Sequence, residues 1–463
     1  MQAVILCPTC KHLNSPDSEF CDRCWRRLSG SSAVSRDEAE ASVLQWMRRR
    51  RMLRWARWSV AAALFVALCA GIANYYGAFE SPLPPPSSGI SAIAGADDWP
   101  MFLRDPLHSA AADVSTTPQG ALKWRFDTDM PMFSSPAVVD GRLYLGSGDG
   151  RVIALDADTG ALLWEHPVTG PVDSSPAVAG DSVFIGLRDG RVLSLHKDTG
   201  ARQWEFPTGG IFATSPVVLE GILYIGSGDG KLYTLDAQTG QVRWEYQTNG
   251  HIASDPAIND DIVAVLSQDS YLHIVDKHTG RKRLDYHTKF ARGSPALSGD
   301  WVYTADQIGL VTAIDWHKRE VPFEKNVRWF RTQLWAWGAL RELPPLKGLA
   351  WAAFVPGSMV ASPIVTEDRL YVAAAEGEVY ALDRETGDVL WTFEADGYFL
   401  SAMTLVGEGL FIGDRFGTLY AISADTGEEL WRYKTGAPIG STPVAANDML
   451  YFTSEDGTLY ALE

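Results

Sequence analysis

The chain has 463 residues, with 57 acidic and 40 basic side chains, and its formal net charge at neutral pH is −17. The acidic excess lies after residue 58, because the first 58 residues hold 11 Lys and Arg against 6 Asp and Glu. An acidic domain of this kind argues against nucleic acid or anionic lipid as its main partner.

The first segment, residues 1–28, carries two cysteine pairs, Cys7 with Cys10 and Cys21 with Cys24. Their spacing suits four thiolates around a tetrahedral zinc ion, and so small a segment has no other means of building a core. Two disulfides are the alternative, which requires an oxidising compartment. The segment resembles the short zinc ribbons at the N-termini of bacterial membrane proteins, which implies a structural zinc ion and a role in protein contact.

Residues 29–58 form a polar and then basic connector, and residues 59–79 follow without a charged side chain. A helix of this length crosses the roughly 30 Å core of a bilayer, so we expect one transmembrane helix. A cleaved signal peptide is disfavoured because the apolar run begins far from the N-terminus. The positive-inside rule then places the N-terminus in the cytoplasm and the remainder outside the cytoplasmic membrane. The charges that decide this are Arg48, Arg49, Arg50, Arg51, Arg54 and Arg57 before the run, and Glu80, Asp97 and Asp98 after it.

Residues 80–96 contain a cluster of prolines followed by Ser87, Ser88 and Gly89. Proline-rich chain is stiff and Ser/Gly chain is flexible. We therefore expect a spacer that holds the following domain a short distance from the membrane.

Residues 97–463 are dominated by a repeat of about 40 residues that ends in the phrase D-x-x-T-G-x-x-x-W. Glycine-rich turns and short apolar runs alternate within each unit, which predicts several short strands per repeat. A repeat of this kind is typical of β-propellers. Counting the degenerate copies, we predict an all-β, eight-bladed propeller. The tryptophans that mark the repeat are Trp124, Trp164, Trp204, Trp244, Trp391 and Trp431.

The two ends of the repeat region predict how the ring closes. The last repeat stops one strand short at Glu463, and residues 122–126, ahead of the first full repeat, look like the missing strand. We expect this segment to pair into the final blade, since an open ring would leave unpaired strand edges.

These repeats resemble those of the quinoprotein-like family, which comprises pyrroloquinoline quinone (PQQ) dehydrogenases and their non-catalytic relatives. The opening phrase from Trp99 to Phe102, followed by Asp105, Pro106 and His108, is similar to the opening of that family. The resemblance implies that the repeated tryptophans pack between blades and are structural. In the dehydrogenases, PQQ lies on the propeller axis beside a Ca²⁺ ion, between a tryptophan and a vicinal disulfide. No two of this chain's five cysteines are adjacent, so neither PQQ nor calcium is expected.

The resemblance leaves three functional interpretations. The non-catalytic relatives include the propeller lipoprotein of the outer-membrane β-barrel assembly machinery, which implies a binding platform or scaffold for proteins of the cell envelope. Similar repeats also serve as extracytoplasmic sensor domains, so a ligand sensor that signals to the cytoplasmic zinc ribbon is an alternative. A PQQ-dependent dehydrogenase is the least favoured. Nucleic acid is not expected as a partner.

A candidate ligand site lies where the repeats differ from one another. Asp173 and Arg292 are the charged residues three positions before the proline step that opens each repeat, and His251 and Tyr398 lie near the same step. The family resemblance implies that this step begins the innermost strand and so faces the axial funnel. These four residues predict a small polar site at the funnel mouth, with a solvated loop rim as the alternative.

One repeat carries an insertion at about 317–360 that is rich in tryptophan and arginine. Within it, Val327, Phe330, Leu334 and Trp337 would share one side of a helix. A packed loop that caps the propeller face would use these aromatics, and this is the interpretation we favour. Exposed Trp and Arg are also typical of interfaces, so contact with a partner or with the membrane surface is the alternative. The candidate partner-binding residues are Trp329, Arg331, Trp335 and Trp337.

Overall fold

The computed structural model describes residues 3–75, 83–93, 95, 98–112, 118–128, 130–211, 214–289, 293–321, 323–344 and 346–463. Its contacts divide the chain into two compact units, residues 1–82 and 83–463. The expected ribbon and membrane helix fall in the first unit, and the expected propeller falls in the second.

The first unit begins with a small sheet that leads directly into a helix. Strands β1 (Ala3–Leu6), β2 (Leu13–Asn14) and β3 (Val34–Ser35) form the order β2-β1-β3, and helix α1 (Arg36–Tyr75) follows β3. Ser35 and Glu38 cap the helix reciprocally, each donating its backbone N–H to the other's side-chain oxygen at 3.4 Å. The segment 29–58, expected as a connector, therefore contributes a strand to the ribbon and is helical from Arg36 onward.

Helix α1 has 40 residues, which is about 60 Å and twice the thickness of a bilayer core. No proline interrupts it, so the arginine-rich segment and the apolar run form one helix. Among the described residues, it is the helix that is long and apolar enough to cross a membrane, with a mean hydropathy of 1.8 over its most apolar window. The last part of the expected span, residues 76–79, lies outside the described residues.

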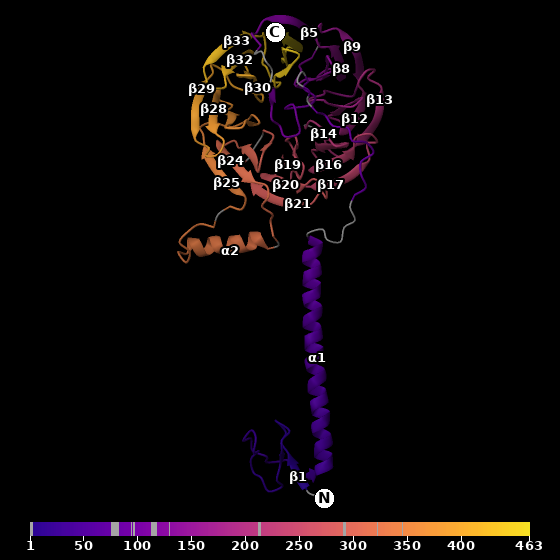
Figure 1. The fold of residues 1–463 in the computed structure, drawn as a ribbon, viewed down its shortest axis with the longest axis vertical. Coiled ribbons are helices and arrows are strands. Elements are labelled where there is room, and N and C mark those ends of the chain that lie inside the picture. Colours follow the sequence, from indigo (N-terminus) through magenta and orange to yellow (C-terminus); the bar gives the residue numbers. More distant parts are fainter. Residues whose placement is uncertain are drawn as a thin grey trace. The chain divides into compact units, whose positions relative to one another are not determined.

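The second unit is a ring of eight sheets, seven with four strands and one with a fifth short strand (Figure 1). Each blade is an antiparallel meander that carries four strands in sequence, so the predicted eight-bladed propeller is confirmed. The strands of blades 1 to 4 are β6 (Ala137–Val139), β7 (Arg142–Ser147), β8 (Arg151–Asp156) and β9 (Leu162–Pro167); β10 (Ala177–Ala179), β11 (Ser182–Gly186), β12 (Arg191–His196) and β13 (Arg202–Pro207); β14 (Val217–Leu219), β15 (Ile222–Gly226), β16 (Lys231–Asp236) and β17 (Val242–Gln247); and β18 (Ala257–Ile258), β19 (Ile262–Ser267), β20 (Tyr271–Asp276) and β21 (Lys282–His287).

Blades 5 to 8 complete the ring, and the closing strand comes from the front of the repeat region. Strand β5 (Leu122–Asp127) pairs antiparallel with β36, with Trp124 opposite Ala461, which confirms the predicted closure. The strands of these blades are β22 (Ala296–Ser298), β23 (Trp301–Ala305), β24 (Leu310–Asp315) and β25 (Leu349–Phe354); β26 (Ile364–Val365), β27 (Arg369–Ala373), β28 (Glu378–Asp383) and β29 (Val389–Glu394); β30 (Thr404–Val406), β31 (Gly409–Gly413), β32 (Thr418–Ser423) and β33 (Glu429–Lys434); and β34 (Val444–Ala446), β35 (Met449–Thr453), β36 (Thr458–Leu462) and β5.

The meander gives the propeller two different faces. The first strands of neighbouring blades contact one another and line the axis. Loops that enter each first strand share a face with the turn between the second and third strands, as shown by bonds from Gly228 N to Ile211 O and from Arg415 N to Tyr398 O, both 2.8 Å. We call this the open face. The opposite side, which carries the other two turns of each blade, is the plug face.

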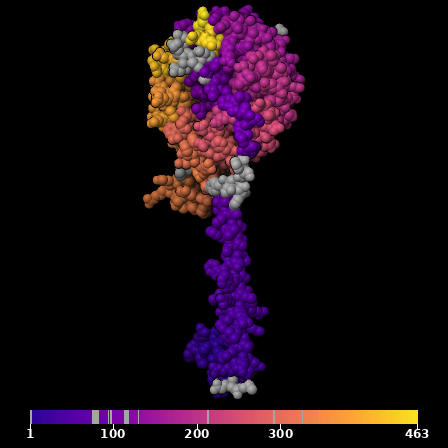
Figure 2. All heavy atoms as spheres, turned by 45° about the vertical axis from the view of Figure 1, so that its right-hand side comes forward, coloured from indigo at the N-terminus to yellow at the C-terminus, as the bar shows by residue number. Residues whose placement is uncertain are grey.

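The plug face is covered at its centre by residues 98–112, which we call the axial plug. The plug bonds to first strands around the axis, and Trp99, Met101, Leu103 and His108 are buried within it. In Figure 2 it belongs to the purple atoms that run across the propeller towards its centre. Its backbone bonds join Trp99 to Val138, Pro100 to Val178, Pro106 to Ile258, Leu107 to Leu297 and Ala110 to Leu405, and β4 (Ala111–Ala112) pairs in parallel with β30.

Each repeated tryptophan binds its blade to the next one. Trp164, for example, packs against Tyr144 of its own blade, and its Nε1 donates to Lys197 O of the next blade at 2.8 Å. Its ring lies on Gly200, the glycine of the next D-x-x-T-G turn. The same contact recurs 33 residues along the chain from Trp124, Trp204, Trp244 and Trp391, and from Trp431 to Pro118 across the closure.

Blade 5 uses a tryptophan that the sequence analysis placed in the insertion. Trp351 lies on β25, donates through Nε1 to Arg384 O at 3.0 Å and covers Gly387. At the preceding junction Leu284 packs on Gly348 in the place of a tryptophan. The position of Trp351, one repeat length before Trp391, could have identified it.

The described part of the expected spacer is bound to the propeller. Ser87 N donates to Asp236 Oδ2 at 2.7 Å, Gly221 N to Ile90 O at 2.6 Å and Ala92 N to Val218 O at 3.1 Å. Residues 84–92 therefore run from the outer edge of blade 3 towards the axis. The expectation of a free spacer over residues 80–96 is wrong for this part, because its backbone is paired with the propeller.

Candidate metal centre and docking surfaces

The four cysteines of the ribbon converge on one point. All four Sγ atoms lie within 4.8 Å of one another, with 3.7 Å between Cys7 and Cys24 and 3.4 Å between Cys10 and Cys21. A tetrahedral site with Zn–S bonds of about 2.3 Å has edges of about 3.8 Å, whereas a disulfide joins its sulfurs at about 2.05 Å. The cysteines are free thiols in this geometry. The donor set fits a tetrahedral thiolate-bound ion such as zinc, which would crosslink the two turns.

The two cysteine pairs lie in equivalent turns. Lys11 N donates to Cys7 O at 3.0 Å and Trp25 N donates to Cys21 O at 2.9 Å. Lys11 and Trp25 both have positive φ, 61° and 59°, so each turn reverses directly after its second cysteine. Although burial opposes ionisation, the backbone N–H groups of Cys10 and Thr9 lower the pKa of Cys7 to about 6. Backbone geometry therefore favours the thiolate form of Cys7, whereas burial raises the pKa of Cys10 to about 12.

The open face carries several large apolar side chains that are about half exposed. Phe133 and Leu400 occupy equivalent positions before the first strands of blades 1 and 7. Tyr398 and Phe416 pack edge to face with ring centroids 6.4 Å apart. Exposed apolar groups gathered on one face mark a binding surface, whereas scattered ones do not. The same face also exposes Met130, Ile211 and Ile308.

The residues proposed for a funnel ligand are engaged locally. Asp173 pairs with Arg188 of its own blade at 2.6 Å, the His251 ring contacts the carbonyl of Gly228, and Tyr398 packs on Phe416. Arg292 lies outside the described residues. Among the three that are described, no contact joins one to another, so the structure does not bring them together as one polar site.

A ring of side-chain oxygens surrounds the axis beneath these loops. In blades 1 to 6 the residue before the proline step accepts the backbone N–H of its counterpart in the preceding blade, as Ser175 and Ser215 do at 3.0 and 3.1 Å. In blade 4 the place is taken by Asp255, which is buried and accepts from Ser215 N and Ser294 Oγ. Burial raises the pKa of Asp255 to about 6. Its carboxyl replaces the hydroxyl that this position carries in blades 1, 2, 3, 5, 6 and 8, whereas blade 7 has Ala402 there. The bonds of Asp255 to its neighbours in the ring indicate a structural role.

The insertion lies between Asp315, the last residue of β24, and Leu349, the first residue of β25. Its two ends are joined by a 2.6 Å hydrogen bond from Asp315 N to Gly348 O. The expected range of 317–360 therefore ends too late, because Leu349–Phe354 is an ordinary fourth strand. Helix α2 (Glu324–Ala336) contains Trp329, Arg331 and Trp335, and Trp337 follows as its C-cap.

Helix α2 lies beside the outer edge of the propeller and covers neither face (Figures 1 and 2). A cavity of about 440 Å³ separates it from blade 4, lined on one side by Asp285 and Tyr286 and on the other by Arg328, Trp329 and Thr332. The expected helix is present, and its tryptophans are 41–73% exposed. A cap over a propeller face is not what the insertion forms.

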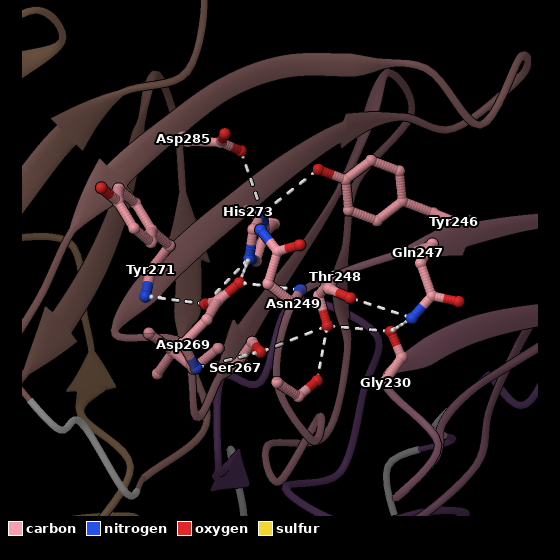
Figure 3. A network of polar contacts seen from close by, with 12 residues as sticks. Gly230, Tyr246, Gln247, Thr248, Asn249, Ser267, Asp269, Tyr271, His273 and Asp285 are labelled. Carbon is pink, nitrogen blue, oxygen red and sulfur yellow. Dashed lines mark hydrogen bonds and ion pairs between the residues drawn. The ribbon is translucent and has the colours of Figure 1, made fainter.

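A buried polar network stiffens blade 4 behind this cavity (Figure 3). His273 Nδ1 lies 2.9 Å from Asp285 Oδ1 and 3.2 Å from the Tyr246 hydroxyl, and His273 Nε2 lies 3.1 Å from Asp269 Oδ2. Although burial opposes ionisation of Asp285, hydrogen bonds from His273 and Lys282 hold its pKa well below the usual range. The network joins β17, β20 and β21, and it anchors the strand beside which α2 lies.

His273 occupies the place of a tyrosine in other blades. In blade 3 the hydroxyl of the equivalent Tyr233 donates a hydrogen bond to Asp229 at 2.7 Å. His273 makes the corresponding contact with Asp269 in blade 4. This equivalence favours a structural role for the histidine. The exchange is visible in the sequence, since His273 lies one repeat of 40 residues after Tyr233.

Comparison with known proteins identifies the family and the fold of this chain but not an activity. The family model described as "Outer membrane protein assembly factor BamB" matches residues 110–321, 346–405 and 399–463, and so leaves out most of the insertion. The crystal structure of BamB from Moraxella catarrhalis is 18% identical, covers 74% of this chain and 97% of its own, and has a TM-score of 0.59.

Proteins of other activities share the architecture. The quinohemoprotein alcohol dehydrogenase ADHIIG from Pseudomonas putida HK5 is 16% identical over 80% of this chain and 82% of its own, with a TM-score of 0.59. The computationally designed Ika8 protein is 16% identical over 75% and 99%, with a TM-score of 0.60. A search of curated protein sequences gives no significant match. At these identities the likeness establishes the propeller alone.

Proposed function

Since the chain belongs to the family of the outer membrane protein assembly factor BamB, we propose that it is a membrane-anchored scaffold that binds a protein of the cell envelope through its open face. The observation that carries the proposal is that Phe133 of blade 1 and Tyr398, Leu400 and Phe416 of blade 7 are all about half exposed on loops of that one face. Aromatic residues and methionine are enriched at the cores of protein interfaces.

The two faces differ in what is left to bind. On the plug face the innermost strands are already paired with the chain's own residues 98–112. On the open face, the loops before the first strands present side chains with no such cover in the described part of the chain. A partner therefore has apolar surface to bury on the open face.

The proposed membrane anchor determines on which side of the membrane each part of the chain would lie. Helix α1 would span the cytoplasmic membrane through residues 59–79, with the arginines and the ribbon in the cytoplasm and the propeller outside. Four cysteine thiols at zinc-site distances accord with a reducing compartment for the ribbon. The ribbon would then offer a second contact surface on the cytoplasmic side.

The residues at the funnel mouth do not fit PQQ. The chain has no adjacent cysteines to form a vicinal disulfide, and Asp173, the carboxylate among the described positions of the inner rim, is already paired with Arg188. Addition of PQQ with Ca²⁺ to the full-length protein should leave its melting temperature unchanged.

The test uses the full-length protein in its own membranes, crosslinked mildly and read by mass spectrometry. Phe133→Asp is compared with Leu163→Asp, which changes an equally exposed side chain, 46% in both cases, on the outer strand β9. We expect an envelope protein that is captured by the native chain and by Leu163→Asp but lost with Phe133→Asp. That protein should then bind the purified chain at least tenfold more weakly when Phe133 is replaced. Identical capture by all three versions would refute the open face as the docking surface.

A further inference from the structure

Helix α2 turns an apolar side away from the propeller. Phe323, Val327, Phe330 and Trp337 follow one another at spacings that place them on one side of the helix. They are 78%, 56%, 54% and 73% exposed. Surface helices of soluble domains ordinarily bury their apolar side against the core.

The side that faces the propeller is held by charged groups. Glu324 Oε2 accepts a hydrogen bond from Lys347 Nζ at 2.7 Å. Glu320, just before the helix, pairs with Lys282 of β21 at 3.0 Å, and its backbone N–H donates to Arg283 O at 2.7 Å. The insertion is thus fixed to blade 4 by polar contacts, while none of the residues that the structure describes covers its apolar side. Such a helix suits an apolar phase outside the propeller.

The chain from helix α1 joins the propeller at the same edge. The Pro84 carbonyl accepts from Arg243 on β17, the outer strand of blade 3, and Ser87 is bound to Asp236 of the same blade. Blade 3 is the neighbour of blade 4, along whose outer strand α2 lies. Residues 76–82 are all that join α1 to Leu83, and seven residues reach at most about 25 Å.

We propose that the apolar side of α2 lies in the surface of the same bilayer that α1 crosses. The inference rests on the membrane anchoring proposed above. Phenylalanine, tryptophan and valine at this surface would be buried to about 5–10 Å, at the boundary of head groups and acyl chains. Tryptophan rings favour that depth because they are apolar with one polar N–H. Helices α1 and α2 then hold the propeller to the bilayer at two points.

A zwitterionic lipid surface is the occupant that the observations favour. The short connection to α1 holds the edge of blades 3 and 4 near the bilayer. It gives no reason for a second protein to lie at the same edge. Anionic lipid is not required, because the domain beyond residue 58 is strongly acidic. A protein partner on α2 is the competing outcome of the test.

The experiment places the full-length protein in phosphatidylcholine vesicles that contain a phosphatidylcholine with a photoreactive acyl chain. After illumination, lipid adducts are mapped by mass spectrometry to residues 59–75 and 324–337. The variants are Phe330→Asp and the control Phe416→Asp, whose side chains are 54% and 57% exposed. Melting temperatures of both variants check that the propeller is folded.

We expect adducts on both helices, with those on α2 reduced about tenfold in Phe330→Asp and unchanged in Phe416→Asp. Adducts on α1 without adducts on α2 would overturn this inference and leave the anchoring intact. Adducts on neither helix would overturn the anchoring itself. If α2 lacks adducts in vesicles but is crosslinked to a protein in native membranes, α2 is a protein-docking element and the lipid proposal is wrong.

Discussion

The contact between each tryptophan and the glycine of the next blade can be tested quantitatively with Gly200→Ala. A Cβ added to Gly200 would lie 2.6 Å from Cε3 and 2.9 Å from Cδ2 of Trp164. The ring cannot retreat freely, because its Nε1 donates to Lys197 O at 2.8 Å and its other side packs on Tyr144. The substitution therefore forces either an overlap or the loss of the hydrogen bond.

Two contributions set the size of the effect. Gly200 has φ +68°, and a left-handed backbone costs alanine about 1 kcal/mol. Overpacking against a fixed ring adds about 2 kcal/mol, for a total of about 3 kcal/mol. Gly141→Ala is the matched control, since Gly141 has φ +71° and nothing within 4 Å of its added Cβ. We expect it to cost about 1 kcal/mol.

The assay is denaturant unfolding of the full-length protein in detergent, followed by near-ultraviolet circular dichroism. The docking energy is the difference between the two variants, about 2 kcal/mol. In a Trp164→Leu background the difference should shrink, because Leu284 already replaces the tryptophan at a native junction. If Gly200→Ala and Gly141→Ala lose the same stability, the tryptophans do not join the blades in the way described.

Three further expectations follow from other parts of the chain. Cys21→Ser should remove the bound metal, measured as zinc per chain, and should raise amide exchange across residues 3–28, because the metal replaces a core there; full zinc content in the variant would refute the site. Asp255 has its pKa raised to about 6 by burial, so its stabilising contribution is complete below about pH 4 and is lost as the pH rises through 6. Asp255→Ser should therefore gain about 3 kcal/mol over the native protein between pH 4 and pH 7, and a pH-independent difference would contradict this. Replacing residues 317–347 by Asp-Thr-Gly keeps the buried Trp316 and should leave the melting temperature within about 3 °C, since Asp315 and Gly348 are already bonded; loss of folding would show that the insertion supports the ring.

The regular repeat made the propeller predictable from the sequence. Where the insertion interrupts the repeat, the positions of individual residues such as Trp351 could not be assigned correctly. The blade count and the closing strand β5 follow from spacing, because neighbouring strands in a meander are neighbours in sequence. The packing role of the tryptophans came from the resemblance to the quinoprotein-like family. Trp351 was assigned to the insertion because counting forward from Asp315 passes through the inserted residues. Counting back from Trp391 gives the correct place.

Contacts between distant segments had no local signal. The axial plug joins His108 to Pro295, 187 residues away, and the supposed spacer pairs with blade 3 through Ser87 and Asp236, 149 residues away. Composition predicted a spacer at 80–96 that is stiff over its prolines and then flexible. A proline-rich chain can still lend carbonyls to a neighbouring blade, as Pro84 does to Arg243.

The parts that depart from the repeat are where binding is expected. In the propeller, most junctions repeat one contact between a tryptophan and the glycine of the next turn, and a computationally designed protein of similar fold shows that such a ring can form without a natural role. Trp337 and Phe330 contribute nothing to those junctions and are exposed, so packing does not explain them. The same holds for Phe133 and Tyr398 on the open face. Apolar side chains that stabilise no blade and remain half in water lower the solubility of the folded chain, and this cost is accounted for if a membrane covers α2 and a protein covers the open face.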